Sequence, residues 1–455
     1  MWKKAVIALL AAIIIACGVI YVQKEKMAAR LTQLLTQQGI EVERLDFHFL
    51  PLPGFTAQNI TYCLHKSFDN SRNSHKVRCF FFENSQLDFK LFSALIGNFM
   101  LDELRLTNGR LQMANQPVPD YQQIQFSLKP HALNMQGIDE LMDYIAGKPM
   151  QNEHAEQWIY EFHLTGTTAV QDQFSLASKL KLLPAGVAIK DTDLAYNNGR
   201  NFTARIDTGY IKSIDTTKSD YQIHFNQLVV NQQDLGKIDA RVLLPQDKYN
   251  RYVAAFTSSA CRQCTSNFEY QDLNVHTKHV QFSTVGFPAE KLLGILKLPV
   301  LLSGNANLQA NVTLSDLNPT EGKVTLNIEN GKIKGLNLLA LVSQYLPINY
   351  DEDKVRDAET EFYQYRSAFG WVGEHIHAEN IAVQTKELAI KGTGYINLAE
   401  MKCDINMNIG LNNEKYKSVA LPIHFFDHCA SPQYKVEITP AFKKQLKQFL
   451  KDRLK

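Results

Sequence analysis

The sequence has almost no net charge and few of the residues that mark specialised chain types. Lys and Arg number 48 against 46 for Asp and Glu, so a formal net charge of +2 leaves no global field to attract nucleic acid. Glycine (23) and proline (15) are too rare among 455 residues for collagen or low-complexity disorder. With 45% hydrophobic residues the chain should fold, and its length suggests two or three domains.

The sequence also lacks the common catalytic motifs. It contains no G-x-x-x-x-G-K-S/T phosphate loop, no H-E-x-x-H zinc helix and no G-x-S-x-G nucleophile elbow. Gly392 and Gly394 begin a dinucleotide-type spacing, but Asn397 stands where the third glycine is required. We therefore expect a protein that is not an enzyme, needs no cofactor and has no nucleic-acid partner.

One segment near the N-terminus is strongly apolar. Ala5 to Val22 carry no charge and follow a short basic start, and this length approaches the ~20 residues that cross ~30 Å of hydrocarbon. The pattern is typical of a secretory signal or an uncleaved signal anchor, and no small-residue cleavage motif closes it. We predict a transmembrane anchor in residues 1–23 and an exported body, with lipid attachment at Cys17 as an alternative.

The other six cysteines form an even set, which suits an oxidising compartment. They fall in three pairs of near neighbours, and loop closure favours bonds between residues close in sequence. The predicted disulfides are Cys63 to Cys79, Cys261 to Cys264, and Cys403 to Cys429. The second pair also has redox-motif spacing, but it lies between strand-like segments rather than at the start of a helix, which favours a structural bond over a catalytic one.

Hydrophobic periodicity predicts an α+β region followed by a β-rich remainder. The period is 3.6 residues over 24–38 and changes to 2 beyond it. Between 120 and 285 strand-like alternation dominates, and 134–146 and 153–158 offer helical alternatives. The N-terminal part predicts strands at 40–49, 56–62, 85–90, 99–106 and 110–113, a short helix at 91–96, and a hairpin turn at Asn108 and Gly109.

Alternation is sharpest in the last third of the chain. From Asn305 to Leu314 apolar residues occupy one strand face and Asn, Gln and Thr the other, and 324–328 and 402–409 repeat the pattern. A polar second face indicates an antiparallel sheet, because parallel sheets are apolar on both faces. The apolar face must be buried in an ordinary core or against a ligand. Its candidate lipid-contacting residues are Leu308, Ala310, Val312, Leu314, Leu326, Ile328, Ile405, Met407 and Ile409.

The C-terminal segment is basic and amphipathic. Pro440 suits the first turn of a helix, and six Lys or Arg residues surround an apolar stripe. Such a helix can lie on anionic lipid, or its stripe can pack against the sheet. The stripe consists of Phe442, Leu446, Phe449 and Leu450.

Two groups of histidines have the composition of metal ligands. His375, His377 and Glu379 share one strand face, and 424–429 contains two histidines, an aspartate and a cysteine. Imidazoles on a wet strand face and a cysteine in a disulfide explain these residues better, so we predict no metal site.

Short motifs follow one another in a characteristic order from residue 288 onward. They are Pro288-Ala289-Glu290-Lys291-Leu292-Leu293, Leu302-Ser303-Gly304, Val324-Thr325-Leu326, Asn330-Gly331-Lys332-Ile333-Lys334-Gly335-Leu336-Asn337-Leu338, Thr360-Glu361-Phe362, Gly392-Thr393-Gly394-Tyr395-Ile396-Asn397-Leu398, Leu421-Pro422-Ile423 and Ser431-Pro432. In order and spacing they resemble the C-terminal region of AsmA-family proteins. Asn330 and Asn337 stand where the family often has Asp. The predicted anchor, helix, Pro-rich break at 50–54 and short helix resemble the N-terminal layout of the same family.

The resemblance implies a protein of the Gram-negative inner membrane with a large periplasmic, β-rich body. The family is associated with outer-membrane assembly, and its larger members resemble bridge-like carriers of phospholipid. The implied body is a long, curled antiparallel sheet with an apolar concave face and a few short amphipathic helices.

We therefore expect four regions: an anchor at 1–23, an AsmA-like α+β region at 24–150, a β-rich middle at 151–285, and an AsmA-like β region with a terminal amphipathic helix at 286–455. The expected function is to bind or pass glycerophospholipid along an apolar groove, in support of outer-membrane homeostasis. The expected partners are membrane phospholipid, the inner membrane and other envelope proteins. The alternatives are an assembly or scaffold factor that carries no lipid, and a redox or metal enzyme.

Overall fold

The computed structural model describes 24–37, 39–64, 78–95, 98–113, 120–131, 133–134, 159–198, 201–215, 219–244, 251–261, 264–273, 277–315, 318–345, 352–412 and 419–453, with the single residues 18, 21, 22 and 137. The chain divides into two compact units, Met1–Lys212 and Ser213–Lys455. The division falls inside the predicted middle region. In the described parts of both units the chain is mainly antiparallel β-sheet with a few short helices, which confirms the predicted β-rich, antiparallel character of the fold.

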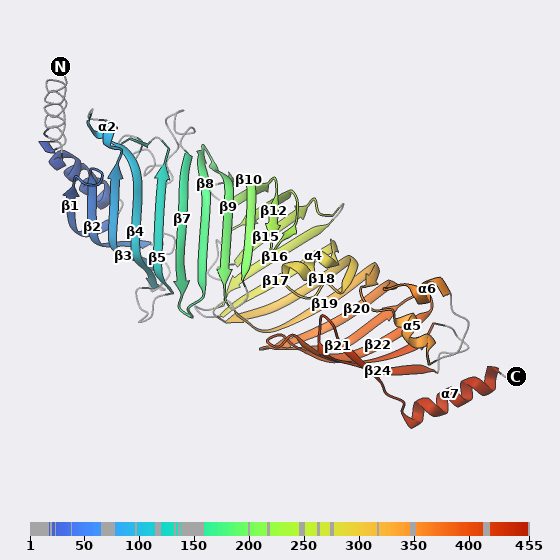
Figure 1. The fold of residues 1–455 in the computed structure, drawn as a ribbon. Coiled ribbons are helices and arrows are strands. Elements are labelled where there is room, and N and C mark those ends of the chain that lie inside the picture. Colours follow the sequence, from blue (N-terminus) through green and yellow to red (C-terminus); the bar gives the residue numbers. More distant parts are fainter. Residues whose placement is uncertain are drawn as a thin grey trace, which may run out of the picture. The chain divides into compact units, whose positions relative to one another are not determined.

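Unit 1 is an antiparallel sheet in which sequence neighbours are hydrogen-bonded neighbours. The short strand β6 (Leu133–Asn134) pairs with the start of β4 (Met100–Met113), and β5 (Tyr121–Pro130) pairs next with β7 (Ile159–Thr168). The strands lie side by side in Figure 1. They are β1 (Ile40–His48), β2 (Gly54–Leu64), β3 (Arg78–Phe89), β4 (Met100–Met113), β5 (Tyr121–Pro130), β7 (Ile159–Thr168), β8 (Gln173–Leu183), β9 (Gly186–Asn197) and β10 (Phe202–Asp215).

Two helical segments pack against the first strands of unit 1. Residues 24–37 form the predicted helix, and α2 (Leu91–Leu95) forms between β3 and β4. Met27 of the first helix and Ala94 of α2 are buried in one cluster with Phe55, Phe89 and Phe99. Successive edge-to-face ring contacts link Phe55 to Phe89 (6.3 Å) and Phe89 to Phe99 (5.8 Å), a geometry that aromatic quadrupoles favour. This cluster is an ordinary closed core.

The predicted hairpin at Asn108 and Gly109 is wrong. β4 runs through this point as one strand, and its pairing with β3 continues on both sides, from Thr107 with Asn84 to Arg110 with Phe81. Asn108 has the positive φ (53°) that the sequence suggested, but that conformation forms a bulge against β5 instead of a chain reversal. Long-range pairing on both sides of the dipeptide outweighs its local turn preference.

Unit 2 is also an antiparallel meander. Between β11 (Asp220–Phe225) and β14 (Ile238–Leu243) the chain makes a small hairpin of β12 (Leu228–Val230) and β13 (Gln233–Asp234). Its strands are β11 (Asp220–Phe225), β12 (Leu228–Val230), β13 (Gln233–Asp234), β14 (Ile238–Leu243), β15 (Arg251–Ser258), β16 (Thr265–Asp272), β17 (Thr277–Pro288), β18 (Leu302–Ser315), β19 (Asn318–Ile333), β20 (Thr360–Val372), β21 (His375–Gln384), β22 (Leu388–Asn397), β23 (Lys402–Leu411), β24 (Ala420–His428) and β25 (Gln433–Val436). The three alternating segments predicted in the last third lie in β18, β19 and β23.

Short helices interrupt this meander at two connections, and one longer helix follows it. α4 (Ala289–Ile295) joins β17 to β18, and α5 (Leu338–Ser343) and α6 (Glu352–Arg356) lie between β19 and β20. α5 buries four apolar side chains, Leu338, Leu339, Leu341 and Val342. The predicted terminal helix is α7 (Pro440–Arg453).

All three predicted disulfides form. Cys63 and Cys79 bridge β2 and β3, Cys403 and Cys429 tie the start of β23 to the end of β24, and Cys261 and Cys264 close the turn between β15 and β16. Cys264 is buried, which favours a structural over a catalytic thiol pair.

Two sets of predictions lie mostly or wholly outside the described residues. The first is the apolar run at 5–22, most of which, including Cys17, lies outside the described residues. The second is the pair of helical alternatives at 134–146 and 153–158, of which only residues 134 and 137 are described. Of the helices that the structure describes, none combines the length and the apolar character needed to cross a membrane.

Candidate functional site

The apolar face of unit 1 contains a hollow lined only by hydrophobic and aromatic side chains. Its volume is about 440 Å³, within the range of small-ligand sites. Five neighbouring strands, β3, β4, β5, β7 and β8, contribute residues, and of these only Tyr121 carries a side-chain polar atom. We call this hollow the aromatic groove. Its lining is Phe80, Phe82, Leu106, Leu111, Tyr121, Ile124, Phe126, Phe162, Leu164 and Phe174.

Strand register places these residues on one face. Phe82 pairs with Gly109, which pairs with Ile124, while Leu106 pairs with Phe126 and Phe126 with Leu164. Directly paired residues on neighbouring antiparallel strands point to the same side of the sheet. Bulges near Asn108 in β4 and Gln123 in β5 shift the alternation, so that Leu111 and Tyr121 also lie on this face.

Two glycines leave room for the aromatic rings. A Cβ added to Gly109 would lie 2.3 Å from Cε1 of Phe82, and one added to Gly166 would lie 2.6 Å from Cζ of Phe174. Each ring therefore lies across the neighbouring strand at a point where that strand has no side chain. Edge-to-face contacts between Phe126 and Phe162 (5.5 Å) and between Tyr121 and Phe174 (5.7 Å) fix the remaining rings.

The aromatic groove is closed at one end of the strands and polar at the other. At the closed end Leu133 of β6 packs with Leu101 and Tyr160 in a buried cluster, and burial raises the pKa of the Tyr160 hydroxyl above its ordinary value. Near the other end the Tyr196 hydroxyl donates a 2.5 Å hydrogen bond to Oδ2 of Asp172. Burial, with this hydrogen bond and the carboxylate charge, raises the pKa of Tyr196.

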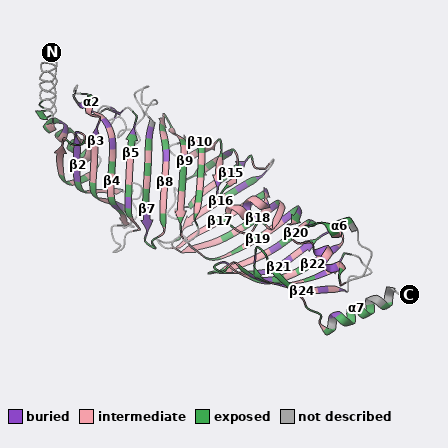
Figure 2. Cartoon of the chain, in the orientation of Figure 1, coloured by how far each residue is buried: buried purple, intermediate pink, exposed green. Residues whose placement is uncertain are grey.

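Unit 2 has one apolar row that is fully closed. Eight residues paired one to the next across eight strands have at most 8% of their surface exposed, and four of them have none. α4 contacts β17 and β18 at this end of the strands, and Figure 1 places α5 beside the following strands. Figure 2 shows buried residues concentrated in the strands near α5 and α6. We call this set the closed row: Phe287, Ala306, Ile328, Tyr365, Val383, Ile390, Ile409 and Leu421.

A second row on the same face of unit 2 is half-exposed. It is displaced along the strands from the closed row, and strand pairing again links each member to the next. Every member is hydrophobic, aromatic or glycine, and every one is only partly buried. We call it the open row: Tyr252, Tyr270, Val280, Val312, Gly322, Trp371, Ile376 and Ile396.

The nine predicted lipid-contacting residues divide between these environments. Ile328 and Ile409 belong to the closed row with no exposed surface, and Leu308 is 9% exposed. Val312 belongs to the open row. The remaining five, Ala310, Leu314, Leu326, Ile405 and Met407, are half-buried. The structure therefore brings all nine onto one sheet face, and their position along the strands separates core residues from accessible ones.

The aromatic groove itself was not among the residues predicted from sequence. Residues 79–82 form the run Cys-Phe-Phe-Phe, in which apolar residues face both sides of β3, so the period of 2 is hidden. On the opposite face Phe81 is covered by the Arg110 guanidinium, 5.0 Å from its ring centroid. A usable signal existed in β5, where Tyr121, Ile124 and Phe126 stand among polar residues.

Residues of the short motifs at 330–338 and 360–362 meet in a polar hollow of about 390 Å³ beside α5. Asn337 caps this helix, because its Oδ1 accepts the Ala340 N–H at 2.8 Å. The Thr360 hydroxyl accepts the Leu338 N–H at 2.8 Å and donates to the Leu336 carbonyl at 2.7 Å. These contacts fix α5 to the start of β20, which gives the motif residues a structural role.

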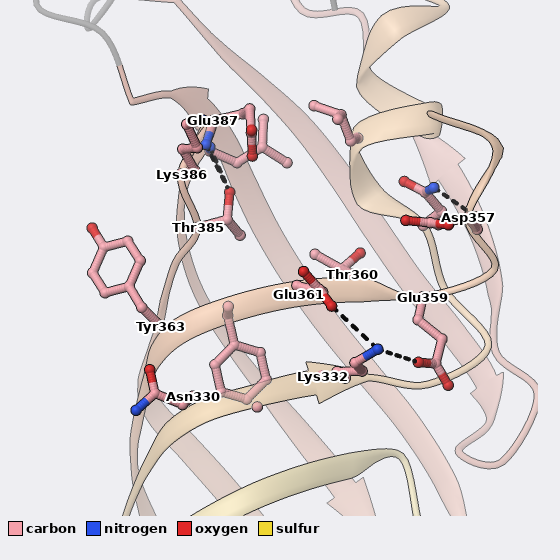
Figure 3. A pocket seen from close by; sticks show the side chains of 15 residues that line it. Asn330, Lys332, Asp357, Glu359, Thr360, Glu361, Tyr363, Thr385, Lys386 and Glu387 are labelled. Atoms are coloured by element: carbon pink, nitrogen blue, oxygen red, sulfur yellow. Dashed lines mark hydrogen bonds and ion pairs between the residues drawn. The ribbon is translucent and has the colours of Figure 1, made fainter. Parts of the chain in front are cut away.

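Charged residues surround the same hollow. Figure 3 shows the Lys332 ammonium between Glu361 (3.2 Å) and Glu359 (3.5 Å), and these carboxylates raise the pKa of Lys332. All three side chains are well exposed to solvent, so the ion pairs are screened and contribute little to stability.

The histidine groups do not assemble into a cluster of ligands. Within the part of the chain that the structure describes, no three His, Cys, Asp or Glu side chains are placed to hold a metal ion. His424 bonds Asp404 (2.9 Å), and His377 stacks on Tyr395 with ring centroids 4.5 Å apart. These are ordinary contacts of a polar strand face.

Comparisons with known proteins add one relative. A protein of Haemophilus influenzae, described as uncharacterized, is 31% identical over 243 residues, which cover 53% of this chain and 60% of the relative. The chain thus spans less than two thirds of that relative's length. No family model matches the sequence, and no solved structure matches it.

Proposed function

We propose that this chain is an AsmA-like protein that binds or passes glycerophospholipid along the apolar face of its sheet. In this proposal the N-terminal apolar run anchors it in the inner membrane, the body lies in the periplasm, and the protein supports outer-membrane assembly without acting as an enzyme. The observation that carries the proposal is the aromatic groove, about 440 Å³ in volume and lined by ten hydrophobic or aromatic residues.

The chemistry of the groove suits an acyl chain. Each CH₂ removed from water contributes about 0.8 kcal/mol and needs no directional partner, so a lining without polar groups is sufficient. A polar or charged ligand would leave its own groups unpaired against these side chains, at a cost of roughly 1–3 kcal/mol for each group. The open row offers the same kind of surface on the strands of unit 2.

Site-specific photo-crosslinking in cells tests this proposal on the full chain. Phe82 lines the aromatic groove, while its neighbour Phe81 faces the other side of β3, and both are half-buried. We expect benzoylphenylalanine at position 82 to form a phospholipid adduct and the same probe at position 81 to form none. Trp371 of the open row and Tyr365 of the closed row provide a second matched pair.

The result also separates the alternative function. Equal adduct yields at positions 81 and 82 would show non-specific exposure to membrane. Folded protein without any phospholipid adduct would contradict the lipid proposal and favour an assembly factor that binds protein partners.

A further inference from the structure

The net positive charge of the chain comes from α7. Residues 440–453 contain five basic residues and one acidic residue, a net charge of +4, whereas the whole chain carries +2. The remainder of the chain is therefore net negative. A helix that differs in this way from its own protein has an electrostatic preference for an anionic surface.

The structure holds α7 by its first turn and leaves its lysines exposed. The Thr439 hydroxyl accepts the Phe442 N–H at 3.1 Å, and Phe442 is 3% exposed. α7 contacts β24 near this point, and Figure 1 shows the helix continuing past β24 rather than lying over the sheet. The exposed lysines are Lys443, Lys444, Lys447 and Lys451.

An apolar stripe runs along the same helix. Leu446 is half-buried, and the sequence repeats apolar residues three and four positions later, at Phe449 and Leu450, which is the spacing of one helix face. A basic flank beside a short apolar stripe is the pattern of helices that lie in the plane of a membrane surface. A helix that binds an acidic protein needs only the basic residues, and a helix that packs in a core needs only the apolar stripe. The combination of both favours a membrane surface.

We propose that α7 docks on a membrane surface rich in anionic phospholipid. Its lysines contact the headgroups, Leu446, Phe449 and Leu450 enter the boundary between headgroups and acyl chains, and Phe442 keeps the helix joined to unit 2. This docking is independent of the aromatic groove, because α7 is a different surface and its lysines contact phospholipid headgroups, whereas the groove would hold an acyl chain.

Vesicle flotation with the full chain tests the docking. The chain is held in phosphatidylcholine nanodiscs, so that the N-terminal apolar run is already in lipid, and is then mixed with vesicles of phosphatidylcholine alone or with phosphatidylglycerol added. We expect at least about tenfold more protein to float with the anionic vesicles. The difference should shrink when ionic strength rises from about 0.1 M to about 1 M, where the Debye length falls to about 3 Å.

Two matched pairs of variants assign the effect to α7. The triple variant K443E/K444E/K447E should lose the preference for anionic vesicles, while K190E/K323E/K391E, with the same charge change at exposed lysines elsewhere, should keep it. Leu450→Ser should lower flotation several-fold, while Gln448→Ser should not. Equal flotation with neutral vesicles, or equal losses in the two triple variants with melting temperatures unchanged, would overturn the proposal.

Discussion

The two units use the same strand pattern but cover their apolar faces differently. Unit 1 leaves a hollow floored by aromatic rings, with glycines at two points where rings cross a neighbouring strand. Unit 2 buries one whole row, with α4 against β17 and β18 at its start, and leaves a parallel row half-exposed. Alternation creates an apolar face in both cases. The elements that lie above it decide whether that face is a core or an accessible surface.

The same contrast exists within each unit. In unit 1 the cluster of Leu101, Leu133 and Tyr160 closes one end of the strands, and the aromatic groove opens beyond it. In unit 2 the closed row contains Ile328 and the open row contains Ile376, on the same face. A sheet can therefore hold itself together at one end while presenting apolar surface at the other.

The sharpest test of this contrast replaces the same residue type in the two rows. Ile328→Ala should lower the free energy of unfolding by about 2–5 kcal/mol, because a fully buried side chain leaves a cavity. Ile376→Ala in the open row should lower it by less than about 1.5 kcal/mol, because water can fill the space. Urea unfolding of both variants measures the difference, and equal losses would show that the open row is part of a closed core.

Removing each disulfide in turn should lower the free energy of unfolding by an amount that depends on the length of the loop it closes. A loop-entropy estimate gives about 3.5 kcal/mol for Cys403–Cys429, with a sequence separation of 26, and about 3 kcal/mol for Cys63–Cys79, with a separation of 16. Cys261–Cys264, separated by 3, should contribute about 1.5 kcal/mol. Hydrogen exchange measured by mass spectrometry should show reduced protection in unit 2 when Cys403–Cys429 is removed and in unit 1 when Cys63–Cys79 is removed. A larger loss of stability for the shorter loop than for the longer one would contradict the loop-entropy account.

The smallest expected effect is a pH dependence specific to unit 1. Burial of Glu103 raises its pKa, but the hydrogen bond and charge of Arg105 and the charge of Lys129 outweigh it, so the pKa lies below its ordinary value. A depressed folded-state pKa adds stability that is present above the unfolded value of about 4.3 and is lost as pH falls through the folded value.

Glu103→Gln should therefore flatten the fall in the urea midpoint between about pH 5 and pH 3. Glu400→Gln in unit 2 is the control, because Lys402 lowers the pKa of that carboxyl but the group lies at the surface, where solvent screens the pair. This role of Glu103 would be contradicted if the urea midpoint of the wild-type protein did not fall with pH. It would also be contradicted if Glu103→Gln and Glu400→Gln changed that fall equally.

Much of the fold followed from local pattern. The helix at 24–37, the strands β18 and β23 and the helix α7 each show one clear period over eight or more residues, and the structure has them close to the predicted bounds. The disulfide pairs followed from short loops. The hairpin at Asn108 failed because pairing with β3 overrides a two-residue turn preference.

The sequence by itself determined that this chain is antiparallel β with one apolar face, because alternation with period 2 fixes which residues share a side of a strand. It could not show which of those residues are accessible, since Ile328 and Val312 lie in the same alternating pattern, yet Ile328 has no exposed surface and Val312 is half-buried. The aromatic groove was also decided by tertiary structure alone, because ten residues from five strands become neighbours only when register aligns the strands and Gly109 and Gly166 leave space for the rings.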